Sequence, residues 1–382
     1  MLFSVVIIDL IGFGIMIPVL PFYAREFGAS ATTLGFLFTI YAAAQFLCAT
    51  AWGRLSDRIG RRRVMLMTIA GTTLALLGLG FARSLLWLFV ARALGGAFAA
   101  NIGVASAYIT DVTPEQDRTR WMGMLGACFG VGFVLGPAIG GALAPFGYAV
   151  PMFAAAGLAG ANWIHAALSL PEPPVRARLS DPARPAGALR VPLVRRLCVA
   201  NFVFSLAVTQ LETMFAFYMG DRFGYDAREV AVLLIAMAVL MGAIQGGGMK
   251  ALAARWSERS LATVGSLLLT AGFLALPLAP SVALLLVPLA LCAVGRAILQ
   301  PALMSMVSLA AQAGARGSVM GTFQASASLA RVLGPIAAGW LYDRQLSAPF
   351  FLAGALLIAV AVQVRGLPSR DPALDPPPLI GL

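Results

Sequence analysis

The chain has 382 residues, of which 60% are apolar and 11% are charged, and its mean hydropathy is +0.88. Soluble domains carry about 25% charged residues, so this composition excludes both an ordinary globular protein and a disordered one. The net charge of +11 is spread over short gaps between apolar runs, without the basic aromatic patch that nucleic acid requires. A polytopic membrane protein is therefore predicted.

Twelve apolar runs, separated by charges, prolines and glycines, predict an all-α protein with twelve transmembrane helices. A helix needs about 20 residues to cross a bilayer. The expected spans are 3–24, 33–53, 64–82, 86–110, 121–145, 149–169, 196–219, 229–250, 261–279, 282–310, 318–342 and 348–366. Prolines interrupt the sequence of the ninth and tenth spans, which leaves eleven or thirteen spans as alternatives.

Nearly all the basic residues are arginines, since Lys250 is the only lysine. With both termini placed in the cytoplasm, nineteen of the 27 basic residues fall in the inner loops and tail and five in the outer loops. The positive-inside rule predicts this orientation. We therefore expect a multi-pass membrane protein with both termini cytoplasmic.

A segment rich in proline and arginine divides the spans six and six. Residues 171–194 contain six prolines and are predicted to form a cytoplasmic linker between halves 1–170 and 195–366, with a cytoplasmic tail at 367–382. The segments 123–143 and 321–341 share eight identical residues, including a Gly-Pro pair. This repeat indicates duplicated six-helix halves, a plan typical of secondary transporters that bind substrate near the membrane midplane.

The loop after the second span reads GRLSDRIGRRR over residues 53–63. Orientation bias explains its arginines but not its glycines and aspartate; the first glycine is expected to let the helix approach a neighbour closely, and the second to permit a tight turn. The run resembles the loop signature G-x-L-[SA]-D-R-x-G-R-[RK] of the major facilitator superfamily. The resemblance implies a cytoplasmic gate latch formed by Gly53, Asp57, Arg58, Gly60, Arg61 and Arg62. Asp111, at the end of the fourth span, is expected to pair with these arginines, whereas the corresponding loop 250–259 lacks the pattern.

The fifth span carries glycines at intervals of four, which leave a smooth helix face for close packing, and a proline that favours a bend. Packing alone is the simpler interpretation of the individual glycines. The whole pattern resembles the antiporter signature of the same family, which implies exchange of substrate for protons. Its residues are Gly123, Gly132, Gly136, Pro137, Gly140 and Gly141.

The first span places Asp9 inside the membrane. An ionised aspartate at this depth costs about 2.5–3.5 kcal/mol, so Asp9 is expected to be paired, hydrated or protonated. Burial favours the neutral form of a carboxyl group, which makes Asp9 a candidate proton carrier; a permanent structural pair with an arginine is the alternative. The run from Asp9 to Pro21 resembles the first-span signature of the twelve-span drug:proton antiporters, including the tetracycline exporters.

Arg92 in the fourth span begins a run, RALGG, that resembles the R-x-x-x-G motif of the same family. A guanidinium does not deprotonate in proteins, so Arg92 is expected to act as a fixed charge that tunes a carboxylate such as Asp9. An arginine that extends toward the outer interface is the alternative.

Polar residues in the seventh span lie on one helix face, at spacings of four, four and three: Asn201, Ser205, Thr209 and Glu212. Such a stripe faces protein or a water-filled cavity. Glu212 is a candidate site for a proton or a cationic substrate, and Asn201 and Thr209 are candidates for the substrate cavity. A helix-packing stripe is almost as well supported.

Four other polar residues fall within predicted spans. His165, the only histidine, is expected to be structural rather than a proton relay. Arg296, Gln324 and Arg331 are expected to line the cavity or to hold the halves together, and the sequence favours neither role. The four cysteines are scattered through apolar runs, so neither a disulfide framework nor a metal site is predicted.

These patterns together predict a major facilitator fold and a monomeric, proton-coupled antiporter that works without a cofactor. Its expected partners are protons, the lipid bilayer and small amphipathic or drug-like compounds, which it exports by alternating access, as in multidrug efflux and antibiotic resistance. The alternatives are a metabolite or sugar transporter of the same fold and, less well supported, a polytopic membrane enzyme.

Overall fold

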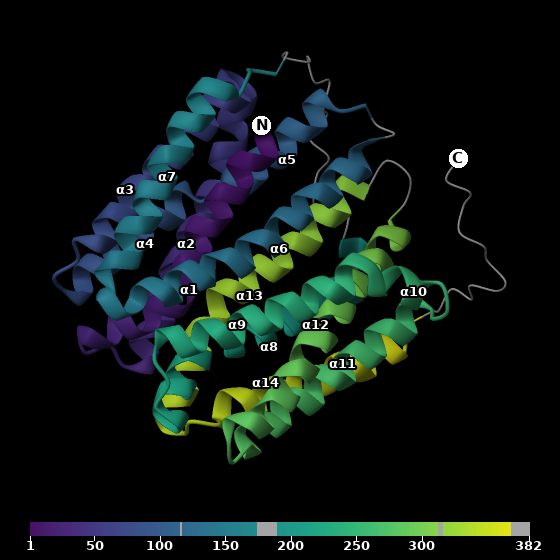
Figure 1. The fold of residues 1–382 in the computed structure, drawn as a ribbon. Coiled ribbons are helices and arrows are strands. Elements are labelled where there is room, and N and C mark those ends of the chain that lie inside the picture. Colours follow the sequence, from purple (N-terminus) through teal and green to yellow (C-terminus); the bar gives the residue numbers. More distant parts are fainter. Residues whose placement is uncertain (115–116, 174–188, 312–315, 368–382) are drawn as a thin grey trace. The chain divides into compact units, whose positions relative to one another are not determined.

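The structure is a computed structural model that describes residues 1–114, 117–173, 189–311 and 316–367. Over these residues the chain is helical, with no strand. The helices of the first part are α1 (Leu2–Glu26), α2 (Ala31–Ile59), α3 (Arg61–Gly80), α4 (Leu85–Phe98), α5 (Asn101–Val112), α6 (Arg118–Leu143) and α7 (Ala149–Ser169) (Figure 1). Those of the second part are α8 (Pro192–Phe223), α9 (Ala227–Ala243), α10 (Met249–Ala253), α11 (Glu258–Ala275), α12 (Val282–Ala310), α13 (Arg316–Arg344) and α14 (Ala348–Arg365).

Each of the twelve predicted spans falls on a helical segment in the described ranges, and the segments of the fourth and eighth spans are divided. Ten of these segments are long and apolar enough to cross a membrane by length and composition. The other two are α7, with 21 residues, and α13, with 29 residues and an arginine within its span. The predicted all-α polytopic fold is confirmed, and the prolines near residues 277–288 do not change the number of spans, because a short 3-10 turn (Leu276–Leu278) ends one helix before the next begins.

The fourth span is not the single helix that was predicted for 86–110. α4 ends at Phe98 and α5 begins at Asn101. The interruption frees main-chain carbonyls, and side chains of α2 bind two of them: Trp52 Nε1 donates to the Ala97 oxygen at 2.6 Å and Gln45 Nε2 to the Ala99 oxygen at 2.9 Å. Inside a membrane every such group needs a protein partner, so these two side chains stabilise the break.

The eighth span, predicted over 229–250, is also modified. A π-helical turn (Ile244–Gly248) separates α9 from α10. Three consecutive glycines, Gly246 to Gly248, lie in this turn. Glycine is a poor helix former and adapts to irregular backbone at low cost, which accounts for the change of helix type at this point.

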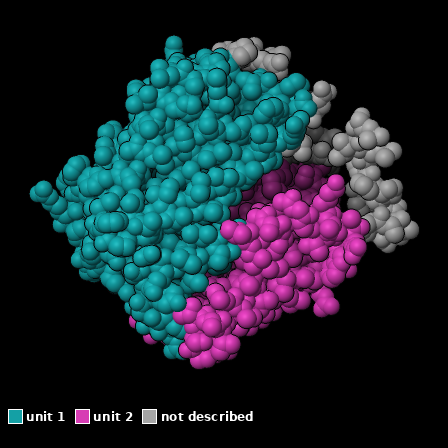
Figure 2. All heavy atoms as spheres, in the orientation of Figure 1, with its two compact units in different colours: residues 1–179, 215–238 teal, residues 180–214, 239–382 magenta. Residues whose placement is uncertain are grey.

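The chain forms two compact units, shown in Figure 2. The first contains residues 1–179 and 215–238, and the second contains 180–214 and 239–382. This division differs from the predicted halves in one segment, 215–238. The segment contains the last part of α8, the first part of α9 and the residues between them. Part of the predicted linker, 174–188, and all but the first residue of the predicted tail, 368–382, lie outside the described residues.

In the first unit α1 packs most extensively against α6 and also against α7. Segment 215–238 joins this unit because it packs on the same helices: Gly220 lies against Phe22 of α1, and Gly141 of α6 lies against Ala231. In the second unit α11 packs on α12 and α14. Gly265 and Gly295 allow α11 and α12 to approach backbone to backbone.

Candidate functional site

The loop between α2 and α3 holds an ion-pair cluster. Arg61, the first residue of α3, contacts the Asp57 carboxylate at 2.5 Å and the Asp111 carboxylate of α5 at 2.8 Å, and it also donates to Ser56. Its side chain is only 7% exposed. A buried guanidinium needs partners on several sides, and these two carboxylates supply its counter-charge.

Gly60 forms the turn that places Arg61. Its φ of +105° lies in the region that favours glycine, and a side chain there would collide with the carboxylate of Glu172. Glu172 Oε1 accepts a hydrogen bond from the main-chain N–H of Arg62 at 3.3 Å, while the Arg62 side chain donates to the Ala167 oxygen at 2.5 Å. Glu172 was missed from the sequence; its position directly after the sixth span, on the same side as the arginine loop, was the available signal.

Two other residues of the loop motif have different surroundings. A side chain at Gly53 would meet nothing within 4 Å, so the prediction that Gly53 allows a close helix approach is wrong. Its carbonyl instead accepts from Ser56 at 2.7 Å. Arg58 is exposed at the end of α2. The contacts of the motif are therefore concentrated at the turn at Gly60 and in the cluster around Arg61.

The glycines of α6 form the close-packed face that their spacing predicts. A Cβ added to Gly132 would lie 2.5 Å from Leu10 Cβ, and one added to Gly136 would lie 2.5 Å from Gly14 Cα. Gly140 approaches the Ile15 main chain equally closely. These three glycines let the main chains of α1 and α6 touch, so the contact depends on the absence of side chains.

The remaining residues of the span-five motif do not share this contact. Gly141 faces Ala231 of α9, and a Cβ added to Gly141 would lie 2.5 Å from the Ala231 Cβ. Gly123 has open space within 4 Å, so it contributes nothing to the packed face. Pro137 lies within the continuous helix α6, close to Gly14.

Asp9 lies at one end of a chain of three polar side chains in the first unit. Asn101 Nδ2 donates to Asp9 Oδ1 at 2.8 Å, and the hydroxyl of Thr68 in α3 donates to Asn101 Oδ1. Asn101 is 5% exposed and Thr68 is fully buried. Neither residue was singled out from the sequence, because a single Asn or Thr in an apolar run carries no pattern.

Arg92 does not contact Asp9. Its guanidinium carbon lies 4.1 Å from the centre of the Tyr41 ring and 5.7 Å from that of Phe38, and Nη1 lies 3.3 Å from Met16 Sδ. The side chain is 3% exposed, and its Nε has no hydrogen-bond partner among the residues that the structure describes. Aromatic faces stabilise a cation, so Arg92 has an aromatic setting and no direct contact with Asp9, the carboxylate that it was predicted to tune.

The polar stripe of α8 packs against α13 within the second unit. Asn201 donates to the Phe323 oxygen at 2.9 Å and to Ser326 Oγ at 3.0 Å. Thr209, which is 4% exposed, lies against Gly334 and donates to the Ser205 oxygen. Both residues hold two helices together, so the packing alternative describes them better than the predicted substrate cavity does.

Glu212 forms an ion pair with Arg296 of α12, with Oε1 2.7 Å from Nη1. The two residues were predicted separately, and the sequence did not indicate that they pair. Gln324 and Arg331 are exposed on α13, and Arg331 contacts Ser328 Oγ at 3.3 Å.

His165 lies in α7 and shares a hydrogen bond of 2.9 Å with Ser4 of α1. This contact ties α7 to α1 near the start of the chain. The position agrees with the structural role that the sequence analysis expected for this histidine.

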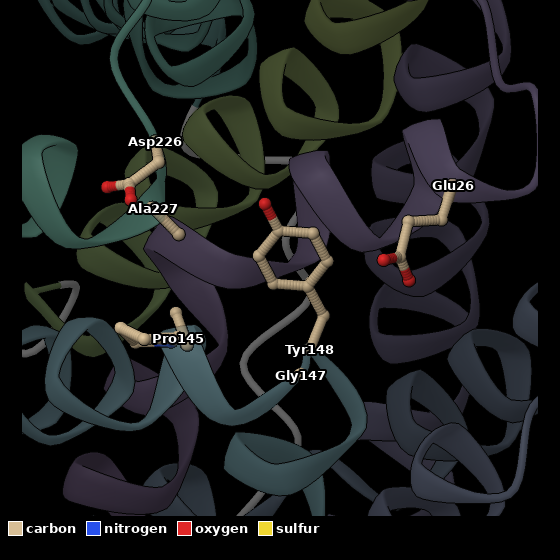
Figure 3. Close-up of a pocket in the computed structure, with 7 residues that line it drawn as sticks. Glu26, Pro145, Gly147, Tyr148, Asp226 and Ala227 are labelled. Atoms are coloured by element: carbon tan, nitrogen blue, oxygen red, sulfur yellow. The ribbon is translucent and has the colours of Figure 1, made fainter.

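At the opposite ends of these helices, segment 215–238 is held to α1 by charge and aromatic contacts. Arg25 of α1 pairs with Asp221 at 2.9 Å, and its guanidinium lies 3.9 Å from the centre of the Phe217 ring. A cavity of about 260 Å³ lies nearby, and Figure 3 shows the Tyr148 ring between Glu26 and Asp226 along it. Its lining comes from helix ends and loops, so it is distinct from the midplane position expected for a substrate.

Ionisable side chains held inside a bundle of membrane helices mark ion and substrate pathways. Asp9, which is hydrogen-bonded to a buried amide, meets this description in a chain of twelve spans, and the partly exposed Glu212–Arg296 pair adds two ionisable side chains within predicted spans. These features define a polytopic membrane transporter.

The chain belongs to the Major Facilitator Superfamily. The profile of that family matches residues 2–275 and 248–379. The resemblance inferred from the loop and span motifs is therefore confirmed, and the chain is a transporter and not an enzyme.

Curated relatives cover nearly the whole chain. The class E tetracycline resistance protein of Escherichia coli is 32% identical over 351 residues, with 89% of this chain and 86% of the relative covered. The class C protein of Escherichia coli is 30% identical over 380 residues, covering 96% of each chain. Multidrug resistance protein 2 of Bacillus subtilis (strain 168) is 27% identical over 372 residues, covering 94% of this chain and 92% of the relative.

Solved structures share the fold. The crystal structure of the human organic anion transporter MFSD10 (TETRAN) has a TM-score of 0.72 at 24% identity, covering 95% of this chain and 97% of that one. A bacterial homologue of the human lysosomal transporter Spinster has a TM-score of 0.77 at 18% identity, covering 95% and 90%.

Proposed function

We propose that this protein exports small amphipathic or drug-like compounds in exchange for protons, with Asp9 as the group that carries the proton. The single observation that supports this assignment is the partner of Asp9, a neutral amide at 2.8 Å. The names of the curated relatives, which describe tetracycline and multidrug resistance, support the class of cargo. Each proton that enters across 100 mV contributes about 2.3 kcal/mol to cargo export.

The partners distinguish the two candidate acids. Glu212 is 2.7 Å from the Arg296 guanidinium, and protonating it would leave that cation without its counter-charge. Among the described residues no Lys or Arg pairs with Asp9. Its carboxyl group can gain or lose a proton without removing the counter-charge of a paired cation, and this is the property that a proton carrier needs.

The loop cluster and the glycine face have supporting roles in the same proposal. The Arg61 cluster joins the end of α2 to the end of α5, and so acts as a latch on the cytoplasmic side. The contact of Gly132, Gly136 and Gly140 with α1 keeps Asp9 at a fixed height relative to α6. Exchange by alternating access requires such rigid contacts within a moving body.

Inverted membrane vesicles test the coupling. Wild-type protein is expected to accumulate tetracycline or ethidium when a proton gradient is imposed and to lose it on addition of a protonophore. Asp9→Asn should abolish accumulation against a gradient while membrane insertion stays normal. Glu212→Gln is the matched control, because it removes a second intramembrane acid and should leave the response to protonophore intact. Full accumulation by Asp9→Asn would refute the assignment.

The same vesicles test the class of cargo. If the vesicles accumulate a sugar or another metabolite but neither tetracycline nor ethidium, the result would favour the alternative, a metabolite transporter of the same fold. Asp9→Asn distinguishes coupling from cargo, because its effect is measured on whichever compound is transported.

We further propose a bacterial cytoplasmic membrane location, a monomeric state and cytoplasmic termini. Lys250, the only lysine, is exposed on α10 and provides the test of orientation. A membrane-impermeant amine reagent should modify Lys250 in inverted vesicles and not in intact cells. Labelling of Lys250 in intact cells would show that the orientation is the opposite of the proposed one.

A further inference from the structure

Asn101 stands at a structurally special point, the first residue of α5 after the interruption of the fourth span. Because the helix restarts there, its side chain reaches from α5 to both α1 and α3. Nδ2 donates to Asp9 at 2.8 Å and Oδ1 accepts from the Thr68 hydroxyl. Both ends of the amide are therefore occupied in a site that is almost fully buried.

An amide differs from a guanidinium or an ammonium group, which can only donate to a carboxyl group. It donates to an ionised carboxylate, and after a half-turn of the side-chain amide its oxygen accepts from a protonated one. The hydroxyl of Thr68 tolerates both orientations, because it can donate to Asn101 or to the Val64 carbonyl oxygen, which lies 3.0 Å away. Hydrogen bonds to a charged acceptor are about twice as strong as neutral ones, so the pair favours the ionised state of Asp9.

We propose that Asn101, oriented by Thr68, is the positioning residue that sets the pH range over which Asp9 releases and takes up its proton. This inference rests on the proposed function of Asp9 as proton carrier. Neither residue is a proton carrier itself, since an amide and an aliphatic hydroxyl do not titrate in this range.

The other charged and titratable groups around α1 have partners of their own. Cys128 of α6 donates to the Phe3 and Met124 carbonyls, His165 of α7 shares its hydrogen bond with Ser4, and Arg92 of α4 lies on Tyr41. Tyr108 of α5 donates to the Pro171 carbonyl. At the start of α3, Arg61 pairs with Asp57 and Asp111. At the end of α1, Arg25 pairs with Asp221. Asn101 is thus the hydrogen-bond partner that the described residues offer to Asp9.

The test is an infrared titration of the purified full-length protein in lipid. The carbonyl stretching band of a protonated carboxyl group reports Asp9 directly, and the band that disappears in Asp9→Asn assigns it; no transport substrate is needed. Asn101→Leu removes the donor to the carboxylate, so the ionised form of Asp9 loses more hydrogen-bond stabilisation than the neutral form does. The midpoint of the titration should rise by about 1 on the pH scale.

Thr68 variants separate positioning from general damage. Thr68→Val removes the donor that polarises the amide, and the midpoint should rise by a smaller amount, about 0.1–0.3 on the pH scale. Thr68→Ser keeps a hydroxyl and should restore the wild-type midpoint. Asn162→Leu is the matched control: it removes another buried asparagine, which donates to the Val5 oxygen of α1 at 2.9 Å, and should lower stability without moving the midpoint.

Each outcome decides a part of the inference. An Asn101→Leu midpoint equal to that of wild type, or a shift of the same size in Asn162→Leu, overturns it. If Thr68→Val and Thr68→Ser have equal midpoints, Thr68 does not orient Asn101. Uphill transport by Asp9→Asn refutes the proposed function but leaves the titration result standing, so the two failures are distinguishable.

Discussion

Replacing Gly136 with alanine tests the close contact between α1 and α6. The added methyl group would lie 2.5 Å from Gly14 Cα and 2.8 Å from the Ile11 carbonyl oxygen, both of which are main-chain atoms. Carbon atoms in ordinary contact are about 3.5–4.0 Å apart. The two helices therefore have to separate locally by about 1 Å, because no side chain can rotate away.

The energetic cost follows from that displacement. Overpacking of a tight interior costs about 1–3 kcal/mol, while alanine gains about 0.5–1 kcal/mol over glycine in a helix. Gly130→Ala is the matched control on the same helix, since a side chain at Gly130 meets nothing within 4 Å. The helix-propensity gain cancels in the comparison, so Gly136→Ala should be about 1–3 kcal/mol less stable than Gly130→Ala.

Thermal unfolding in detergent measures the stability difference, and cargo accumulation in inverted vesicles measures function. We expect a lower Tm and slower exchange for Gly136→Ala, and a Tm at or above that of wild type for Gly130→Ala. If the two variants unfold at the same temperature and exchange at the same rate, backbone contact at Gly136 does not matter.

Three other substitutions have defined outcomes. Asp111→Asn removes one of two carboxylates from Arg61 and should cost about 1–3 kcal/mol of stability and slow turnover, with cargo affinity unchanged; normal turnover would refute the latch. Arg25→Gln should lower the Tm more than Asp221→Asn does, because the exposed ion pair contributes about 0–1 kcal/mol and Arg25 also loses an aromatic contact; equal Tm values would contradict this. Asn201→Leu should reduce stability and leave the range of transported compounds unchanged, whereas an altered range would return Asn201 to the substrate cavity.

The positions of the spans were predictable because the bilayer imposes a length and an apolar composition on every helix. Close helix packing was predictable from the spacing of Gly132, Gly136 and Gly140. Glycines at this spacing leave a smooth helix face whichever helix lies against them. The breaks in the fourth and eighth spans were not predicted, because hydropathy averages over a window and is insensitive to a change of a few backbone angles.

The partners of the polar residues were the part that the sequence could not supply. Which side chain meets Asp9 depends on how each helix is rotated about its axis, and apolar runs leave this rotation undetermined. Arg92 and Asn101 both lie in the fourth span, yet only Asn101 reaches the carboxylate. The stripe that begins at Asn201 has the same spacing whether it faces another helix or a cavity.

The break at residues 99–100 has a mechanical consequence. A continuous helix carries torsion from end to end because every turn is bonded to the next, whereas here the carbonyls at the break are bonded to α2. At the break, hydrogen bonds to side chains of α2 therefore replace part of the bonding that would join one helical turn to the next. Arg92 lies in the piece before the break, while Asn101 and Asp111 lie in the piece after it. The residue that contacts Asp9 therefore shares one continuous helix with a carboxylate of the loop cluster and not with Arg92.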